Sequence, residues 1–357
     1  MTDGNILEIN GSFGEGGGAI LRLSAAFSIL FNRNIRIKNI RANRSKPGLR
    51  MQHLLGLTTL AAITNSKLSN CEVGSKEITL LSNEDYLKDY FEINISTAAN
   101  IGLLLQPIQI ACLKYHQPER VSLKINGGGT FGQWAPSLDY LSNVSYPIYT
   151  QAGLDIDLTI NRHGFYPKGG AKVLCSIHLP KKPLNPINLT RLGKITKLQG
   201  EIIITSQLGQ RGTNIGKRIQ DTIRHEIMQT LGIESNIEIQ YVDSLSTGVG
   251  LCLWAKSDTG AIISTGTILG EKQITSEKLG QTAAHLIIKY IKNEIPVDNY
   301  LSDQLIPLMA YIKGSSKIRV LEITSHTKTN LKLIEFFTNR TYTIVENENS
   351  FVIEFES

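Results

Sequence analysis

The chain has 357 residues, of which 41% are hydrophobic and 19% charged, and its formal net charge is +6. It can therefore bury a full hydrophobic core and is long enough for two domains or for one domain with an insertion, while its charge favours a polyanionic partner. The four cysteines form no CxxC pair, and the longest apolar runs are far shorter than the roughly 20 residues of a membrane span. We expect reduced core cysteines, no membrane partner and a cytoplasmic location.

A glycine-rich turn near the N-terminus is the most informative segment. Gly14, Gly16 and Ala19 have the GxGxxG/A spacing between an expected strand and an expected helix. A dinucleotide-binding fold also needs an acidic residue about 20 positions further on, where this chain has only Arg and Lys, and the Gly-Lys-Ser/Thr ending of an NTPase loop is missing. The turn still lets backbone N–H groups approach an anion, and Glu15 could help to hold a divalent metal. A tight turn with a solvated Glu15 is the structural alternative.

A block of basic residues follows this turn. Residues 16–70 contain no Asp or Glu. An ordinary surface interleaves both signs of charge, so the block indicates an anionic partner. Its basic residues are Arg22, Arg33, Arg36, Lys38, Arg41, Arg44, Lys46, Arg50 and Lys67.

Strand-like and helix-like segments alternate along the first half of the chain. In order they are an expected strand at 6–9, helix at 20–30, strand at 35–40, helix at 51–63, strand at 77–81, helix at 98–106, strand at 121–125, helix at 136–146 and strand at 154–160. The pattern recurs after roughly 80 residues, which suggests repeated units of one sheet and two helices in a mixed α/β fold.

A break at 180–186 separates a second pattern from the first. Its elements are an expected strand at 200–205, a helix at 215–231 and strands at 236–242 and 248–256. We predict an inserted small α/β domain at 185–275 within a large domain made of 1–184 and 276–357, with a strong helix at 277–291. The loop GQRGTNIGK at 209–217 is expected to be a flexible connector rather than a second phosphate site.

The histidines are the main candidates for a catalytic side chain. His326 lies in the segment 324–330, between an expected strand at 318–323 and an expected helix at 331–337, and such turns often carry reactive groups in α/β folds. Position alone leaves both a catalytic and a structural role open for it. Most of the other histidines are expected to be structural, although His53 follows the basic block and could contact a phosphate.

Several segments in order resemble the RNA 3′-terminal phosphate cyclases. They are GSFGEGGGAILR at 11–22, IRANRSKPGLRMQHL at 40–54, LLLQ at 103–106, RHGFYPKGG at 162–170, YLSDQL at 300–305 and SHTKTN at 325–330. The resemblance implies a fold of α/β (α+β) class, with a large domain of repeated units, each a four-stranded sheet with two helices, interrupted by a small inserted α/β domain.

The resemblance also implies an ATP-dependent, ligase-type reaction on RNA that ends in a 3′-phosphate. The imidazole of His326 would attack the α-phosphorus of ATP, the AMP would move to the RNA phosphate, and the neighbouring 2′-OH would displace AMP to leave a 2′,3′-cyclic phosphate. Adenylylation supplies the good leaving group that a phosphate monoester lacks, and the intramolecular attack has a large effective molarity. Mg²⁺ or another divalent metal would offset the charge of the triphosphate.

Further site residues follow from the resemblance position by position. His326 matches the nucleophile, and Glu15 matches the acidic metal candidate. The nucleotide-binding matches are Gln106, Tyr300, Leu301, Ser302, Asp303 and Gln304. The matches for binding the RNA terminal phosphate are Arg22, Arg41, Arg44 and Gln52. On the residues alone, YLSDQL favours the start of an amphipathic helix with a solvated Asp303 over a nucleotide site.

The chain departs from the family pattern in places. Ala19 stands where members commonly have Gln, and 95–100 and GGGTFGQWAPSLDYL at 127–141 also differ.

Two other hypotheses remain for the function. One is a non-catalytic RNA-binding relative acting in ribosome biogenesis, which would lack the nucleophilic histidine. The other is an enolpyruvyl transferase, which has a similar repeated fold. The biological RNA, the preference among nucleotides and metals, and the oligomeric state are not specified by the sequence.

Overall fold

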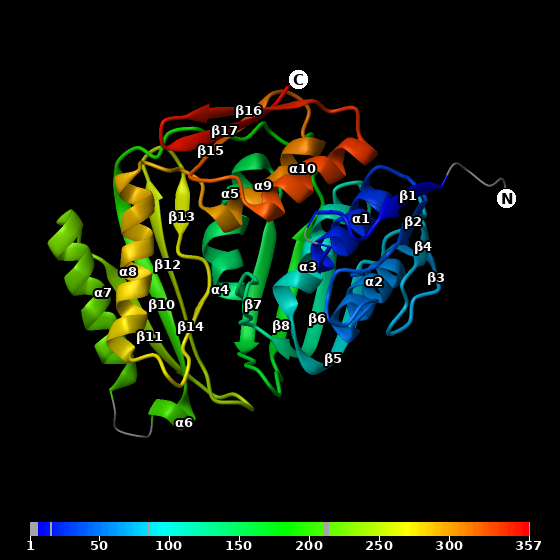
Figure 1. Cartoon of the computed structure of the whole chain (residues 1–357). Helices are drawn as coiled ribbons and strands as arrows, with labels where there is room; N and C mark the ends of the chain where they lie inside the picture. The colour runs from blue at the N-terminus through cyan, green and yellow to red at the C-terminus, as the bar shows by residue number, and fades with distance from the viewer. Residues whose placement is uncertain (1–5, 15, 85, 210–213, 357) are drawn as a thin grey trace.

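The computed structural model describes residues 6–14, 16–84, 86–209 and 214–356. Its first unit is a four-stranded sheet in the order β1-β2-β4-β3 (Figure 1). Its elements are β1 Leu7–Asn10, α1 Gly18–Leu30, β2 Ile35–Lys38, α2 Met51–Thr64, β3 Lys67–Ser69 and β4 Ile78–Leu81. Strands β1 and β2 are parallel and joined through α1, whereas the other neighbours in the sheet are antiparallel.

The second unit repeats this topology. Its strands lie in the order β5-β6-β8-β7, again with a parallel first pair joined by a helix and antiparallel pairs elsewhere. Its elements are β5 Tyr90–Asn100, α3 Ile101–Cys112, β6 Arg120–Gly129, α4 Leu138–Tyr140, η1 Leu141–Ser145, α5 Tyr146–Ala152, β7 Ile156–Arg162 and β8 Lys172–His178.

A third sheet has the same order read from its other edge, β9-β15-β17-β16, and the same parallel first pair. Its elements are β9 Asn188–Leu189, α9 Asn299–Tyr311, β15 Ser316–Val320, α10 Ser325–Phe337, β16 Tyr342–Asn347 and β17 Ser350–Phe355. The mixed fold with repeated four-stranded units is therefore confirmed, and the repetition includes the order and direction of the strands.

A five-stranded sheet interrupts the crossover between β9 and β15. Its order is β11-β10-β12-β13, with β14 pairing β12. Its elements are β10 Ile195–Thr205, α6 Ser206–Gly209, α7 Ile215–Leu231, β11 Asn236–Val242, β12 Val249–Ser257, β13 Ile262–Ser264, β14 Ile268–Leu269 and α8 Ser276–Lys292. Strand β9 pairs with β15 although it follows residue 185, and α8 contacts α7 and β12 although it follows residue 275. The predicted domain limits at these two residues stay a prediction.

Two helices begin three or more residues from the position that the sequence suggested. The helix expected from residue 98 begins at Ile101, because β5 continues to Asn100 and the Asn100 side chain accepts a hydrogen bond from Leu103 N at 2.9 Å. The helix expected from residue 331 begins at Ser325, because Thr324 caps it. His326 therefore lies in the first helical turn and not in the preceding loop.

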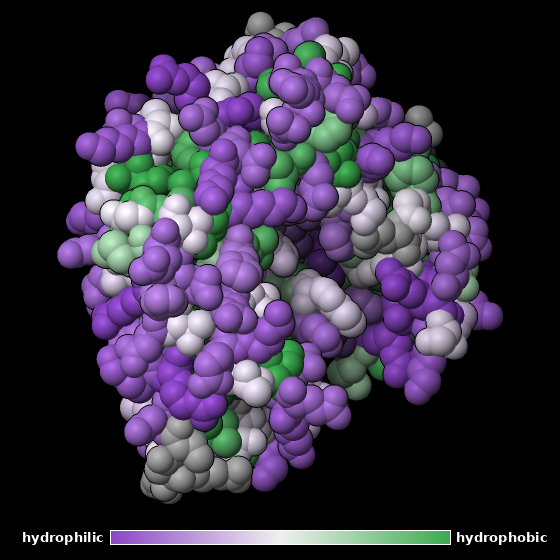
Figure 2. All heavy atoms as spheres, turned by 60° about the vertical axis from the view of Figure 1, so that its left-hand side comes forward, coloured by the Kyte–Doolittle hydropathy of each residue, from purple (hydrophilic) through white to green (hydrophobic). Residues whose placement is uncertain are grey.

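The helices of the repeats pack against one another as well as on their own sheets. Helix α1 contacts α2, α3 and α10, and α9 contacts α10, so elements far apart in sequence meet there (Figure 1). The face turned forward in Figure 2 is predominantly hydrophilic and is hollowed near its centre. Within the described ranges, no helix is long and apolar enough to cross a membrane. The cysteines are free, and all but half-buried Cys71 are buried.

Candidate active site

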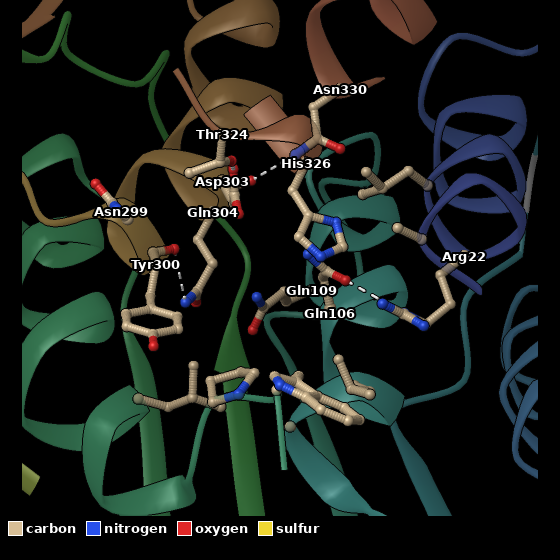
Figure 3. A pocket seen from close by; sticks show the side chains of 17 residues that line it. Arg22, Gln106, Gln109, Asn299, Tyr300, Asp303, Gln304, Thr324, His326 and Asn330 are labelled. Carbon is tan, nitrogen blue, oxygen red and sulfur yellow. Dashed lines mark hydrogen bonds between the residues drawn. The ribbon is translucent and has the colours of Figure 1, made fainter. Parts of the chain in front are cut away.

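A cavity of about 290 Å³ lies where helices of the three repeats meet (Figure 3). Helix α1 contributes Arg22, α3 contributes Gln106, and the start of α10 contributes His326. Helix α9 and the loop after β6 complete the lining with Tyr300, Asp303, Gln304, Trp134 and Pro136. The fold thus gathers at one point residues that are spread over most of the sequence.

Helix α9 is fixed at its first turn by Asp298. The buried Asp298 carboxylate accepts hydrogen bonds from Tyr300 N at 3.0 Å, Leu301 N at 2.9 Å and Tyr140 Oη at 3.0 Å through one oxygen, and from Ser264 N at 3.0 Å through the other. Burial raises the pKa of Asp298 to about 6, although these hydrogen bonds act in the opposite direction. The cap orients the following turn, which brings Tyr300 to the cavity.

The ring of Tyr300 is held by close packing. A Cβ added at Gly266 would lie 2.4 Å from a ring carbon of Tyr300, and the ring of Tyr140 packs edge-on at 6.2 Å between centroids. Tyr300 nevertheless keeps 39% of its surface exposed, and Gln304 reaches back to its carbonyl oxygen at 3.4 Å (Figure 3). An aromatic surface beside amide and carboxylate groups suits a nucleoside.

The start of α10 is tied to α9 through Asp303. Oδ1 of Asp303 accepts hydrogen bonds from Thr327 Oγ1 at 2.8 Å and Thr324 Oγ1 at 3.2 Å, and its carbonyl oxygen accepts one from Asn330 Nδ2 at 3.0 Å. Thr324 also accepts from Thr327 N at 2.9 Å as the N-cap. These bonds fix the turn that carries His326, whose half-buried imidazole points toward the side of the cavity occupied by Gln106 and Arg22 (Figure 3).

Arg22 is the cation of the cavity. Its Nε donates to Gln106 Oε1 at 3.3 Å, and burial lowers the pKa of its guanidinium to about 10 (Figure 3). A guanidinium with such a pKa keeps its charge at neutral pH and can bind phosphate oxygens through two N–H groups. The imidazole of His326 and a phosphate-binding cation therefore share one cavity.

A basic cluster surrounds the first turn of α1. A Cβ at Gly18 would lie 2.5 Å from Nε2 of His53 and 2.9 Å from Nη1 of Arg22, and a Cβ at Gly17 would lie 3.1 Å from Nη2 of Arg44. A Cβ at either position would crowd these side chains, and among the described residues no side chain caps this helix. An anion bound here would meet both the N–H groups of the helix and the cations.

The charges of this cluster shift one another's protonation. Burial, followed by the charges of Arg22, Arg41 and Arg50, lowers the pKa of His53 to about 4. Burial and the charges of Arg50 and Arg44 lower the pKa of Arg41, whose Nη1 donates to the carbonyl oxygens of Lys46 at 2.8 Å and Gly48 at 3.1 Å. The backbone thus holds Arg41 in place against the repulsion of its charged neighbours.

A family model described as RNA 3′-terminal phosphate cyclase matches residues 13–344. The chain belongs to this family. It is 37% identical to the RNA 3′-terminal phosphate cyclase of Methanosarcina barkeri (strain Fusaro / DSM 804), over 98% of this chain and 99% of the relative. It is 33% identical to that of Pyrobaculum aerophilum, over 98% of each chain, and 34% identical to that of Pyrococcus abyssi, over 94% of each chain. The enolpyruvyl transferase NikO from Streptomyces tendae also aligns, at 10% identity over 99% of this chain and 82% of its own chain. Its TM-score is 0.23, which is too low to indicate a shared fold.

The structure brings the predicted residues of this cyclase family member to three places. His326, Arg22, Gln106, Tyr300, Asp303 and Gln304 line the cavity. Arg41 and Arg44 lie in the basic cluster, and Gln52 is half-buried at the start of α2, next to His53 in the chain. Leu301 and Ser302 lie on the fully buried side of α9, where Ser302 Oγ donates to Asn299 O at 2.9 Å. A nucleotide contact by these two residues stays a prediction.

Some lining residues escaped the sequence analysis. Asn299 and Gln109 have no motif of their own, and they reach the cavity because they lie on the same sides of α9 and α3 as the other lining residues. Trp134 and Pro136 lie in a segment that stood out only as a departure from the family pattern. The available signal in the sequence was a tryptophan that closely follows three glycines.

Glu15, the predicted metal residue, lies outside the described residues. Among the residues that are described, no group of three or more His, Cys, Asp or Glu side chains could hold a metal ion. Asp303 does offer a carboxylate to the cavity. Because Mg²⁺ is commonly held by one or two carboxylates together with substrate phosphates and water, this donor set fits an ion that arrives with a nucleotide.

Proposed function

We propose that this protein uses ATP to convert the 3′-terminal phosphate of an RNA into a 2′,3′-cyclic phosphodiester, through an adenylyl-histidine on His326 and an RNA adenylate. The observation that carries this proposal is the imidazole of His326 inside a cavity that also contains Arg22 and the polar side of α9. Membership of the cyclase family supports the overall reaction, and the placement of His326 supports the route.

The first step requires a fixed nucleophile and a held triphosphate. His326 attacks the α-phosphorus of ATP, a P–N bond forms, and pyrophosphate leaves with the electrons of the broken P–O bond. The hydrogen bonds to Asp303 hold the turn of His326 in place, so little orientational freedom is lost on the way to the transition state. Tyr300 offers a ring for the adenine, and Arg22 faces the charge that develops on the phosphates.

The second and third steps need an anion site beside the nucleophile. The basic cluster around α1 binds the RNA phosphate, one of whose oxygens attacks the adenylyl phosphorus and frees the imidazole. The 2′-OH then attacks the activated phosphate, loses its proton, and expels AMP. Arg22 lines the cavity and also borders Gly18 of the cluster, so it connects the two substrates.

A divalent ion would supply charge neutralisation to the triphosphate. The residues of this chain that would hold it are Asp303 and, as the family resemblance suggests, Glu15.

The non-catalytic RNA-binding relative remains the second candidate, because the basic cluster alone would explain RNA binding. RNA binding alone would leave the imidazole of His326 in the cavity without a role. Labelling with ATP separates the two functions.

The test is incubation of the protein with ATP labelled at the α-phosphate and Mg²⁺, followed by a denaturing gel. We expect acid-labile label on the wild type that leaves on addition of a 3′-phosphorylated oligoribonucleotide, and no label on His326→Ala. His285→Ala is the matched control, since His285 is exposed on α8 and pairs with Glu226 at 3.3 Å. An unlabelled wild type across several divalent metals would exclude the cyclase and leave the RNA-binding function.

A further inference from the structure

Trp134 is an exposed aromatic residue at the cavity of His326. It lies in the loop between β6 and α4, lines the cavity, and is 87% exposed. The other tryptophan, Trp254, is buried in β12. An indole that contributes nothing to a core but stands beside a polar cavity calls for a partner outside the protein.

The backbone at Trp134 has an unusual conformation. Its φ is +56°, in the left-handed region that a bulky side chain rarely adopts. Such a conformation persists only where the surrounding structure imposes it, and it is concentrated at binding and catalytic sites.

The chain before Trp134 is firmly anchored. The ring of Phe131 is buried and stacks on Phe165 at 5.1 Å and on His163 at 5.8 Å between centroids. Thr130 N donates to Gly164 O at 2.9 Å, and Thr130 Oγ1 pairs with Nδ1 of His163 at 3.1 Å. The segment 162–170 therefore supports this loop.

The chain after Trp134 is anchored as well. Pro136 O accepts a hydrogen bond from Asn100 Nδ2 at 3.4 Å, and Ser137 N donates to Thr267 Oγ1 at 2.7 Å. The backbone that carries the indole is thus held on both sides, so little backbone entropy is lost when a flat ligand stacks on the ring.

The charges around the cavity indicate what kind of flat ligand this is. Arg22 and the basic cluster bind phosphates, and a planar group attached to a phosphate is a nucleobase. The proposed reaction brings two nucleosides to one cavity, and the cavity has two aromatic residues, Tyr300 on α9 and Trp134 on the loop. Tyr300 is packed against Tyr140 and Gly266, whereas Trp134 is open to solvent, as suits a strand that continues out of the site.

We propose that Trp134 is a stacking platform for a nucleobase at the 3′ end of the RNA, an inference that rests on the proposed function for the identity of the polymer. Stacking is tolerant of base identity because every base has a π-face. Trp134 therefore binds RNA ends without selecting their sequence, and it holds the terminal ribose beside His326 while AMP is transferred.

Binding is tested by tryptophan fluorescence without ATP. Emission from exposed Trp134 is separated from that of Trp254 as the difference between the wild type and Trp134→Phe. We expect a 3′-phosphorylated oligoribonucleotide to quench this signal. The same oligonucleotide with abasic residues at its last two positions should bind without quenching. Quenching by ATP alone, and not by the oligonucleotide, would overturn the proposal and assign Trp134 to the adenine.

Substitution measures the contribution of the ring. Trp134→Leu should weaken binding of the intact oligonucleotide by about 5- to 100-fold, as expected for loss of one stacked base, while Trp134→Phe keeps most of the affinity. The wild type and Trp134→Leu should bind the oligonucleotide with abasic terminal residues with equal affinity. Tyr90→Ala, which removes an exposed aromatic on β5, is the control. Equal affinity of wild type and Trp134→Leu for the intact oligonucleotide would contradict the proposal.

The two proposals fail separately. If the protein binds RNA but forms no adenylate, the fluorescence and affinity results still decide the role of Trp134. If adenylate forms and RNA is cyclised while Trp134→Leu binds the RNA end as wild type does, only the stacking platform is lost.

Discussion

Two helix starts face the candidate active site, and they are built in opposite ways. The first turn of α10 is capped by Thr324 and tied by its threonine hydroxyls to Asp303. Among the described residues, no side chain caps the first turn of α1, which is surrounded by Arg22, Arg44 and His53. The charges of the two arginines meet the positive end of the helix.

The difference teaches how stability and binding are divided between these regions. Hydrogen bonds hold the α10 side in its working geometry, so a change there should reduce stability and activity together. On the α1 side, the like charges of Arg41, Arg44 and Arg50 lie close together and a bound anion would offset them, so a change there can reduce activity and raise stability.

The largest effect is expected from Arg22→Met. Cyclisation should fall by about 100-fold or more, because a charged donor to the phosphates is lost from the site. The free energy of unfolding should rise by about 1 kcal/mol, because an apolar chain of similar length replaces a half-buried cation among cations. Turnover and urea unfolding measure the two quantities.

Arg36→Met is the control for this prediction. Arg36 lies on β2, away from the cavity lining, and pairs with Glu8 at 3.7 Å and Glu77 at 3.6 Å. Its loss should leave turnover unchanged. A fall in stability of Arg22→Met would show that the cluster is not strained and would end the contrast between the two helix starts.

An intermediate effect is expected from Asp303→Ala on the other side. The hydroxyls of Thr324 and Thr327 lose their acceptor, so the turn of His326 loosens and formation of the protein adenylate should slow by about 10- to 100-fold. The free energy of unfolding should fall by about 1–3 kcal/mol, which urea unfolding measures.

Thr327→Val removes one of these hydrogen bonds and nearly keeps the volume. It should lower the free energy of unfolding by about 1 kcal/mol, less than Asp303→Ala does. Full stability of Asp303→Ala with complete loss of adenylate would instead mean that the carboxylate acts on a ligand and does not position the helix.

The smallest effect is a pair of opposite pH dependences. His53 has a folded pKa of about 4, below its usual 6.5, so its contribution to stability is present above pH 6.5 and is lost as the pH falls toward 4. Asp298 has a folded pKa of about 6, above its usual 3.8, so its contribution is present below pH 3.8 and is lost as the pH rises through 6.

Unfolding in urea between pH 4 and pH 7 tests these signs. As the pH falls from 7 to 4, His53→Gln should lose about 1–2 kcal/mol less of its free energy of unfolding than the wild type does. As the pH rises from 4 to 7, Asp298→Asn should lose about 1–2 kcal/mol less than the wild type does. The effect at half-buried His53 is limited because solvent screens part of its charge. Gln also keeps an acceptor for Arg50 N, which His53 Nδ1 provides at 3.2 Å. The same pH slope in wild type and both variants would remove these groups from the comparison.

Much of the fold was readable because its signals are local. The helix at 215–231 has the predicted bounds, and the glycine turn, α1 and α2 lie where periodicity and turn residues put them. The starts of α3 and α10 were wrong by several residues, because side-chain caps at Asn100 and Thr324 overrode hydrophobic periodicity. The cytoplasmic location and Mg²⁺ stay predictions.

The sequence by itself determined the repeated units, the basic block and, through short motifs in order, the family and the candidate nucleophile. These features depend on neighbours in the chain, where composition and spacing carry the information. Only the tertiary structure decided that Arg22, Gln106 and His326 share one cavity and that Trp134 stands open beside them. Such proximity depends on how helices of separate repeats pack, and packing between distant segments leaves no local pattern in the sequence.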